Sequence, residues 1–281
     1  MKKPEWLRVR HVQSPNLAMV ETLLAELNLN TVCREANCPN WAECFSKKTA
    51  TFMILGTNCT RTCQFCNVRH AAPSPVDSEE PERVAEAVLA LGLRYVVITS
   101  VTRDDLPDGG ARHFAAVIRA IQKRAPQVAV EALIPDFLGN FNALELVTAA
   151  RPAVISHNME TVAALYSAVR PQADYGRSLR VLEMIKAQNP EIRSKTGIML
   201  GLGEKESQVL ALFGDLRTVG CEFLTIGQYL APSKAHYPVQ EYIEPAVFDA
   251  YGEIARRMGF DFVTSAPLVR SSYHAGEALG M

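Results

Sequence analysis

The sequence predicts an α/β protein in which strands and helices alternate and the strands run parallel. Short apolar runs are separated by longer segments whose apolar residues follow helical spacing. Six strand–helix repeats follow one another from Met53-Ile54-Leu55 onward, and such alternation is typical of parallel βαβ units. The number of repeats fits a partial barrel, a doubly wound sheet or a full eight-fold barrel, and it does not choose among them.

An amphipathic helix is expected over residues 15–29, because its apolar side chains recur at helical spacing. The next helix begins among acidic residues and Pro81 and ends near Gly92, which are common helix boundaries, and a buried strand follows at 95–99. Later strands are expected at 127–133, 153–156, 194–200, 222–227 and near Phe262, and later helices at 111–124, 141–150, 161–169, 177–188, 205–219 and 245–258.

Length and composition restrict the class of protein. A chain of 281 residues predicts one or two domains, and 48% hydrophobic with 21% charged residues is ordinary for a globular protein. The formal net charge of −1 gives no field that favours nucleic acid or an anionic membrane. No apolar run approaches the roughly 18 residues that span a bilayer, and no apolar signal-peptide segment follows the N-terminus. We therefore expect a cytoplasmic protein without nucleic-acid or membrane partners.

Three cysteines, Cys59, Cys63 and Cys66, lie within eight residues directly after the apolar run 51–56. Three thiolates on one loop can converge on a metal centre, and soft sulfur ligands select iron–sulfur clusters, zinc or copper(I). Structural zinc usually takes four protein ligands, whereas a four-iron cluster held by three cysteines leaves one iron open. The loop follows a strand, where functional groups of parallel α/β folds gather.

This loop resembles the C-x₃-C-x-aromatic-C signature of the radical S-adenosylmethionine (SAM) superfamily, with Phe65 as the aromatic residue. The resemblance implies a [4Fe-4S] cluster that binds SAM. It also implies a partial (β/α)₆ barrel, which agrees with the six repeats. The alternative is a zinc loop or a chance group of cysteines.

A second group of three cysteines precedes the first, at Cys33, Cys38 and Cys44. Six of the seven cysteines thus lie between residues 33 and 66, and an odd total in a reducing compartment favours metal ligation over disulfides. One mixed zinc site or a few buried free thiols are the alternatives. A separate second cluster is favoured because each triple is locally complete, while Cys221 is expected to be a core thiol.

The order C-x₄-C-x₅-C followed by C-x₃-C-x₂-C resembles the lipoyl synthase family of radical SAM enzymes. The segments 35–40, 65–68 and 270–274 are similar to that family as well, and the resemblance extends from about residue 30 to 275. It implies an auxiliary [4Fe-4S] cluster on the first triple, with Ser271 as its fourth ligand and Ser272 as the less favoured choice.

The resemblance also implies three parts of the chain. Residues 1–48 would be an N-terminal extension with the auxiliary-cluster cysteines, 49–265 the radical SAM partial barrel, and 266–281 a tail that closes the auxiliary cluster.

Candidate SAM-binding residues follow two of the strands. After the strand at 95–99, the polar segment with Thr99, Ser100, Gly109 and Gly110 matches the glycine-rich element that holds the methionine amino group in radical SAM enzymes, and glycine lets backbone approach a ligand. The alternative is an ordinary polar turn before a helix. Asn158 could bind a ribose and Glu160 lies beside it, although Ser156 or Asn158 could equally cap a helix.

The strand at 194–200 carries Lys195 and Gly197 within a sequence similar to the family's G-x-I-x-G-x-x-E element, which packs against adenine. Lys195 could meet a carboxylate or simply lie at a solvated strand end. His157 is expected to be a structural histidine.

The activity that the resemblance implies is the radical insertion of sulfur at C6 and C8 of a protein-bound octanoyl-lysine. Acids, bases and nucleophiles cannot attack unactivated methylene C–H bonds, so cofactors must bring the chemistry and no side chain is expected to be catalytic in that sense. The implied cofactors are two [4Fe-4S] clusters and SAM. The auxiliary cluster would be consumed as the sulfur source.

The implied partners are an octanoylated lipoyl carrier domain (2-oxoacid dehydrogenase E2 or glycine cleavage H protein), an electron donor such as flavodoxin or ferredoxin, and an iron–sulfur carrier for cluster repair. Two alternatives remain: another sulfur-inserting or dehydrogenating radical SAM enzyme, or a zinc-stabilised binding module without catalysis.

Overall fold

The computed structural model describes residues 2–9 and 14–281. The chain divides into two compact units. The N-terminal unit comprises Val9–Arg61, Asn67–Ile155 and His274–Met281, and the C-terminal unit comprises Met1–Arg8, Thr62–Cys66 and Ser156–Tyr273.

The N-terminal unit contains a buried parallel sheet. Strand β2 (Thr51–Ile54) pairs with β5 (Tyr95–Ser100), and β5 pairs with β6 (Ala129–Leu133). Residues Phe52, Ile98 and Ala132 lie in register across the three strands. The short strand β1 (Asn30–Thr31) adds an antiparallel edge to β2, and β7 (Val154–Ser156) follows Ala153, whose N–H donates to the Val130 carbonyl. Near-continuous apolar strands of this kind are typical of parallel sheets that are covered on both faces.

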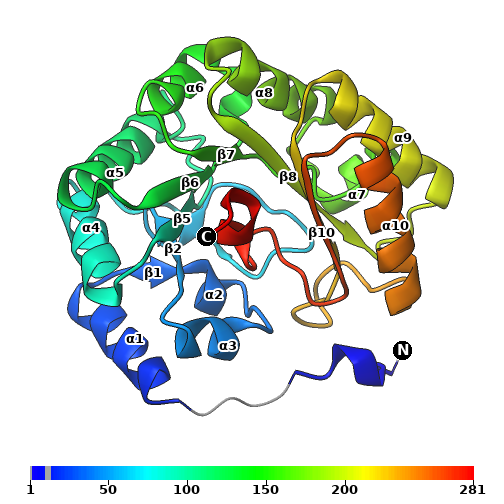
Figure 1. Cartoon of the computed structure of the whole chain (residues 1–281), viewed down its shortest axis with the longest axis horizontal. Coiled ribbons are helices and arrows are strands. Elements are labelled where there is room, and N and C mark those ends of the chain that lie inside the picture. The colour runs from blue at the N-terminus through cyan, green and yellow to red at the C-terminus, as the bar shows by residue number, and fades with distance from the viewer. Residues whose placement is uncertain (1, 10–13) are drawn as a thin grey trace. The chain divides into compact units, whose positions relative to one another are not determined.

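Helices α4 (Glu80–Leu91), α5 (Ala111–Arg124) and α6 (Phe141–Thr148) follow one another along the outer side of these strands, as Figure 1 shows. Helix α4 begins with proline in its first turn and ends at Gly92, whose φ of +65° is easily adopted only by glycine. Helix α1 (Pro15–Glu26) begins at Ser14, whose hydroxyl accepts the Asn16 N–H. The expected helix at 15–29 is therefore present but ends three residues earlier.

Several short elements of the N-terminal unit were not expected from the sequence. They are helices α2 (Val32–Glu35) and α3 (Trp41–Ser46), the parallel two-stranded sheet of β3 (Asn58–Cys59) and β4 (Arg69–His70), and the 3₁₀ turns η2 (Phe137–Gly139) and η4 (Ala275–Leu279). Each is too short to show a hydrophobic period. The last turn packs on β5, since a Cβ on Gly276 would lie 3.3 Å from the Tyr95 Cβ.

The C-terminal unit contains the parallel strands β8 (Arg193–Leu200), β9 (Phe223–Gln228) and β10 (Phe262–Ser265). Its helices are α8 (Tyr175–Gln188), α9 (Glu206–Thr218) and α10 (Pro245–Arg257), with short turns at η1 (Glu5–Leu7), η3 (Ala163–Leu165) and α7 (Tyr166–Val169). The single helix expected at 161–169 is wrong in form. Val162 is extended, with φ −76° and ψ 157°, so the segment starts as a 3₁₀ turn and becomes helical only at Tyr166.

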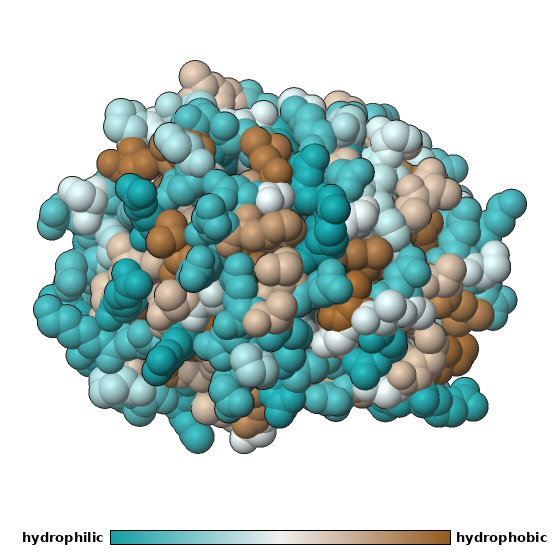
Figure 2. Space-filling model, turned by 90° about the horizontal axis from the view of Figure 1, so that it is seen from above, coloured by the Kyte–Doolittle hydropathy of each residue, from teal (hydrophilic) through white to brown (hydrophobic). Residues whose placement is uncertain are grey.

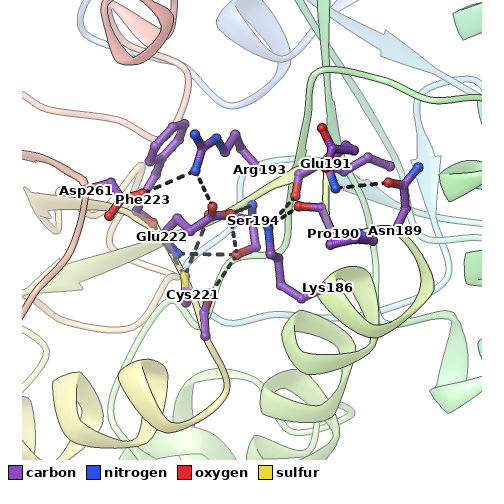
Figure 3. A network of polar contacts seen from close by, with 12 residues as sticks. Lys186, Asn189, Pro190, Glu191, Arg193, Ser194, Cys221, Glu222, Phe223 and Asp261 are labelled. Carbon is purple, nitrogen blue, oxygen red and sulfur yellow. Dashed lines mark hydrogen bonds and ion pairs between the residues drawn. The ribbon is translucent and has the colours of Figure 1, made fainter.

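A polar network joins the N-terminal ends of these strands, as Figure 3 shows. The Glu222 carboxylate accepts hydrogen bonds from the Ser194 N–H at 2.8 Å and from the Arg193 guanidinium, and Lys186 Nζ lies 3.1 Å away. Burial alone would raise the pKa of Glu222, but the Ser194 N–H, Arg193 and Lys186 together hold it below its ordinary value. Cys221 is buried beside this network, and burial raises the pKa of its thiol to about 12, so it is the core thiol that was expected.

The surface is mainly polar on the face drawn in Figure 2, where hydrophobic residues occur in small groups. Within the described ranges, every helix is too short or too polar to cross a bilayer.

Candidate functional site

The first cysteine triple lies on two short helices of the N-terminal unit. Cys33 is in α2, where Thr31 Oγ1 accepts its N–H at 3.1 Å, and Cys44 is in α3. Between them, the Cys38 N–H donates to the Cys33 carbonyl at 3.1 Å. Asn37 makes the turn with a φ of +51°, a conformation that asparagine tolerates better than most residues. Cys33 and Cys44 thus lie on two successive short helices, and Cys38 lies on the turn between them.

The thiols of this triple interact electrostatically. Burial, and then the neighbouring Cys33 and Cys38, raise the pKa of the Cys44 thiol to about 12. Thiolates in such a group repel one another unless a cation balances their charge, which a bound metal centre would do. The donor set therefore fits an iron–sulfur cluster.

A hydrogen bond connects the segments that carry or follow the two cysteine motifs. Asn67, directly after the second motif, donates its Nδ2–H to the Glu35 carbonyl between Cys33 and Cys38, at 2.8 Å. A single hydrogen bond thus joins segments that are 32 residues apart in the chain.

The second motif begins in the N-terminal unit. Cys59 ends β3, and its Sγ accepts the N–H groups of Arg61 at 3.5 Å and of Thr102 at 3.3 Å. N–H donors to sulfur stabilise thiolates and tune the potential of an iron–sulfur cluster. This arrangement fits a cluster ligand and differs from that of Cys221, whose Sγ lies near the Phe223 and Ser194 carbonyls.

The remaining cysteines of this motif belong to the C-terminal unit. The Cys66 N–H donates to the Cys63 carbonyl at 3.1 Å, and His236 Nε2 lies 3.2 Å from the Cys66 carbonyl. Phe65, the aromatic residue of the signature, packs against the buried cluster of Val169, Leu202 and Tyr229. Its role is therefore to anchor the loop in an apolar core.

Among the described residues, no three His, Cys, Asp or Glu side chains converge as the ligands of one metal ion do. A four-iron cluster is larger than one ion, and its cysteines bind different irons. Metal ligation by the six motif cysteines and by Ser271 stays a prediction.

The candidate SAM residues of the N-terminal unit lie in two settings. Thr99 Oγ1 donates to the Leu133 carbonyl at 3.1 Å, so its hydroxyl already links the neighbouring strands β5 and β6. Within the described part of the chain, Ser100 Oγ is buried and has no hydrogen-bond partner. Such an orphaned hydroxyl at a strand end is available to a ligand.

Gly109 and Gly110 are closely packed against neighbouring side chains of the protein. Their φ values are +60° and +90°, and a Cβ on Gly109 would lie 2.8 Å from Phe137 Cδ1, whereas one on Gly110 would overlap Leu55 Cδ1. Close packing of the protein is thus sufficient to require both glycines. Gly110 also borders a cavity of about 710 Å³, whose walls include Val76, Pro81, Leu106 and Ala143.

Several candidate ligand-binding residues of the C-terminal unit contact one another. Asn158 Nδ2 donates to Glu160 Oε1 at 3.0 Å and to Ser271 Oγ at 3.3 Å. A Cβ on Gly197 would lie 3.0 Å from Asn158 Oδ1 and 3.3 Å from Ser271 Cβ. In the described part of the chain, Asn158 Oδ1 is buried and lacks a partner. The unused amide oxygen beside a glycine cradle fits a ligand with hydroxyl donors, such as a ribose.

Neither Ser156 nor Asn158 caps the following turn, whose N-cap is Val162. Burial raises the pKa of Glu160 above its ordinary value, against the lowering effects of Arg170 and Asn158. Sequence reasoning missed Arg170, whose Nη1 donates to the carbonyls of Asn158 and Met159 at 2.9 and 3.1 Å.

Lys195 and His157 belong to the interior. Lys195 is only 2% exposed, which excludes the alternative of a solvated strand end. His157 Nε2 lies 3.1 Å from Ser178 Oγ, and its carbonyl accepts Thr196 Oγ1 at 2.8 Å. The expectation of a structural histidine agrees with these contacts.

Comparison with known proteins identifies the family. The sequence model of the Radical SAM superfamily matches residues 53–216. Lipoyl synthase of Alkaliphilus metalliredigens is 57% identical over 278 residues, which cover 99% of this chain and 96% of that protein. Lipoyl synthase of Caldanaerobacter subterraneus is 55% identical over 281 residues, covering 100% of this chain and 98% of that protein.

A solved structure of methylornithine synthase has a TM-score of 0.55 at 13% identity and covers 93% of this chain and 81% of that chain. At this identity the likeness concerns the fold alone. It confirms the expected α/β class and, with the family match, the partial (β/α)₆ barrel. Sequence identity of this extent over the whole chain also excludes the zinc-stabilised binding module, and the chain belongs to the lipoyl synthase family of the radical SAM superfamily.

Proposed function

We propose that this chain inserts two sulfur atoms, at C6 and C8, into an octanoyl group carried on a lysine of a partner protein, and so makes a lipoyl group. The observation that carries the proposal is the hydrogen bond from Asn67 to the Glu35 carbonyl. It links the residue that follows the radical SAM motif to the segment that carries a second complete cysteine triple, and a sulfur-inserting enzyme needs both groups of cysteines.

The two cysteine triples would bind different clusters. Cys59, Cys63 and Cys66 would hold the [4Fe-4S] cluster that takes SAM, and Cys33, Cys38 and Cys44 would hold the auxiliary cluster, with Ser271 as its fourth ligand. SAM and its cluster supply a 5′-deoxyadenosyl radical, which can remove hydrogen from an unactivated methylene group. The auxiliary cluster is the sulfur-donating substrate and is consumed.

The side chains position and shield the reactants. The buried Asn158 Oδ1 would accept a ribose hydroxyl, and Asn158 Nδ2 holds Glu160 and Ser271 in place. The further proposed SAM contacts are Ser100, Gly109, Gly110, Lys195 and Gly197. Thr99 would support this site indirectly, because its hydroxyl is hydrogen-bonded within the sheet. The apolar cluster of Val169, Leu202 and Tyr229 excludes water and stray hydrogen donors from the loop that carries Phe65.

The partners follow from the chemistry. The octanoyl group arrives on a lipoyl carrier domain, of a 2-oxoacid dehydrogenase E2 or of the glycine cleavage H protein. A flavodoxin or ferredoxin would supply the electrons, and an iron–sulfur carrier would rebuild the consumed cluster. In the described part of the chain no disulfide joins any of the seven cysteines, which supports a reducing compartment such as the cytoplasm.

The test is an anaerobic reaction of reconstituted enzyme with SAM, a reductant and an octanoyl-lysine peptide, analysed by mass spectrometry. The wild-type chain should form 5′-deoxyadenosine and a peptide in which two C–S bonds replace two C–H bonds. Cys59→Ala should form neither product, whereas Cys44→Ala should still form 5′-deoxyadenosine but no sulfur-containing peptide. Formation of 5′-deoxyadenosine by the wild type with an unchanged peptide would contradict the proposed substrate.

Ser271→Ala and Ser272→Ala separate the two candidate fourth ligands. We expect Ser271→Ala to abolish sulfur insertion while 5′-deoxyadenosine formation persists, and Ser272→Ala to have the smaller effect. The reverse result would assign the ligand to Ser272.

A further inference from the structure

Arg61 is a buried cation in the middle of the loop that carries Cys59. Its side chain is 4% exposed. Its Nε and Nη2 donate to the two oxygens of Asp104 at 2.7 and 3.0 Å, and Nη2 also donates to Asp136 Oδ1 at 2.6 Å. Asp104 follows β5 and Asp136 follows β6, so one guanidinium links the loop to the ends of two neighbouring strands.

The backbone around Arg61 is fixed by the same segment. The Thr60 N–H and Oγ1 both donate to the Thr102 carbonyl, at 3.1 and 3.0 Å. Thr60 Oγ1 in turn accepts the Asp104 N–H at 3.1 Å. The loop is therefore attached to the segment after β5 by its main chain, by a hydroxyl and by an ion pair.

The residues held in this way donate hydrogen bonds to the Cys59 sulfur. The two N–H groups that reach Cys59 Sγ belong to Arg61 and Thr102. Both donors lie on residues that the attachments hold, so a shift of the Arg61 guanidinium would move them relative to the sulfur. Groups that orient metal ligands in this way affect metal affinity and activity by about 10- to 100-fold.

A simple stabilising ion pair would be the ordinary explanation of this arrangement. Burying the charges of Arg61 and Asp136 costs desolvation energy, and well-packed apolar residues often give equal or greater stability. The guanidinium geometry is also specific, since its flat fork engages Asp104 with two parallel hydrogen bonds. Precise placement of the loop accounts for this geometry better than stability does.

We propose that Arg61 is a positioning residue which, by bridging Asp104 and Asp136, aims the Arg61 and Thr102 N–H groups at Cys59 Sγ and so sets the properties of the cluster that Cys59 holds. This inference rests on the proposed function, because it takes Cys59 as a cluster ligand. It adds a residue whose guanidinium contacts Asp104 and Asp136 and which acts on the cluster through Cys59.

The experiment compares reconstituted Arg61→Lys with wild type and with Arg193→Lys. Arg193 also bridges two carboxylates, Glu222 and Asp261, at the N-terminal strand ends of the C-terminal unit, so it serves as the control for loss of a bridging guanidinium. The measurements are iron content, the reduction potential, and the change that SAM causes in the electron paramagnetic resonance spectrum of the reduced protein. Only the cluster that binds SAM contributes to that change.

Lysine keeps the charge but loses the fork. We expect Arg61→Lys to keep its iron, to alter the SAM-dependent spectral change and the potential, and to form 5′-deoxyadenosine about 10- to 100-fold more slowly. Arg193→Lys should match wild type in all of these. An Arg61→Lys enzyme with full iron, wild-type spectra and a wild-type rate would overturn the inference.

Asp104→Asn keeps the size of the side chain and decides the question if Arg61→Lys does not fold. It should change the spectrum in the same direction by a smaller amount, and a wild-type spectrum would overturn the inference. Failure of the proposed function has a different signature, in which wild type itself forms no 5′-deoxyadenosine.

Discussion

Two arginines of this chain each bridge two carboxylates, at opposite ends of parallel strands. Arg61 bridges Asp104 and Asp136, which follow the C-terminal ends of β5 and β6, and its side chain is 4% exposed. Arg193 begins β8 and bridges Glu222 and Asp261, which precede β9 and β10, and its side chain is 47% exposed. The chemical groups are similar, whereas burial and position differ.

The difference shows what each end of the strands does. Functional loops of barrel folds follow the C-terminal strand ends, and the N-terminal ends mainly contribute stability. Glu222 has three partners and remains satisfied if one is lost. Asp136 is only 1% exposed, and it accepts the Leu138 N–H as well as the guanidinium of Arg61, which belongs to the cysteine loop. The Arg61 network therefore tolerates change less than the Arg193 network.

The largest expected effect is that of removing each arginine. Arg61→Met breaks the buried ion pair with Asp136 and should lower the free energy of unfolding by about 3–5 kcal/mol. Arg193→Met removes a side chain that is 47% exposed and leaves Glu222 with Ser194 and Lys186, so it should cost at most about 1 kcal/mol. Urea unfolding of the reconstituted proteins, followed by circular dichroism, measures both.

The double variant Arg61→Met with Asp136→Asn is the control, since it removes the cation and one of the charges left behind. It should be more stable than Arg61→Met alone. Equal losses for Arg61→Met and Arg193→Met would show that the two networks do not differ as their burial indicates.

The next effect concerns the glycine pair of the N-terminal unit. Gly110→Ala places a methyl group against Leu55 in a positive-φ conformation and should cost about 3 kcal/mol. Gly220→Ala, in the C-terminal unit, has a similar backbone conformation at φ +72° but open space around its Cβ, so it should cost about 1 kcal/mol. Thermal unfolding compares the two.

This pair of variants also separates packing from ligand binding. If Gly110 is required only so that its backbone can approach SAM, the alanine variant will keep its thermal stability and lose SAM affinity. If packing on Leu55 is the reason, stability will fall without any ligand.

How much the sequence could predict depends on how local each feature is. The long strands and helices, Cys221 as a core thiol and the helix end at Gly92 follow from patterns within a few residues. Arg61 and Asp136 are 75 residues apart, and nothing in their neighbouring residues signals the pair. The unused oxygen of Asn158 likewise appears only where Gly197 of β8 lies beside it, and Arg170 reaches the Asn158 and Met159 carbonyls across 12 and 11 residues of chain.

A smaller effect is expected for Glu222→Gln, and it depends on pH. The pKa of Glu222 is lowered in the folded state, so the carboxylate contributes stability at pH values above its unfolded pKa of about 4.3. That contribution is lost as the pH falls through the folded-state value. The variant should be less stable than wild type by about 1–2 kcal/mol at pH 7, and the gap should close in acid.

Thermal unfolding at pH 7 and at successively lower pH measures this gap. Tyr175→Phe, which removes the hydroxyl bonded to Asp215 in the same unit, is a control whose tyrosine does not ionise in this range. A gap for Glu222→Gln that persists unchanged in acid would assign the stability to packing rather than to the charge.

The smallest effect is expected for Cys221→Ala, and it tests the division of the cysteines. Cys221 is fully buried at the start of β9, and its sulfur is near carbonyl oxygens rather than N–H donors. Cys59 Sγ, by contrast, accepts two N–H groups. We therefore expect Cys221→Ala to keep the wild-type iron content and visible absorption and to lose about 1 kcal/mol of stability.

Cys44→Ala should lose about half of the iron, because one of two equal clusters loses a ligand. A loss of iron from Cys221→Ala would show that hydrogen bonding to sulfur does not distinguish a ligand thiol from a core thiol in this fold.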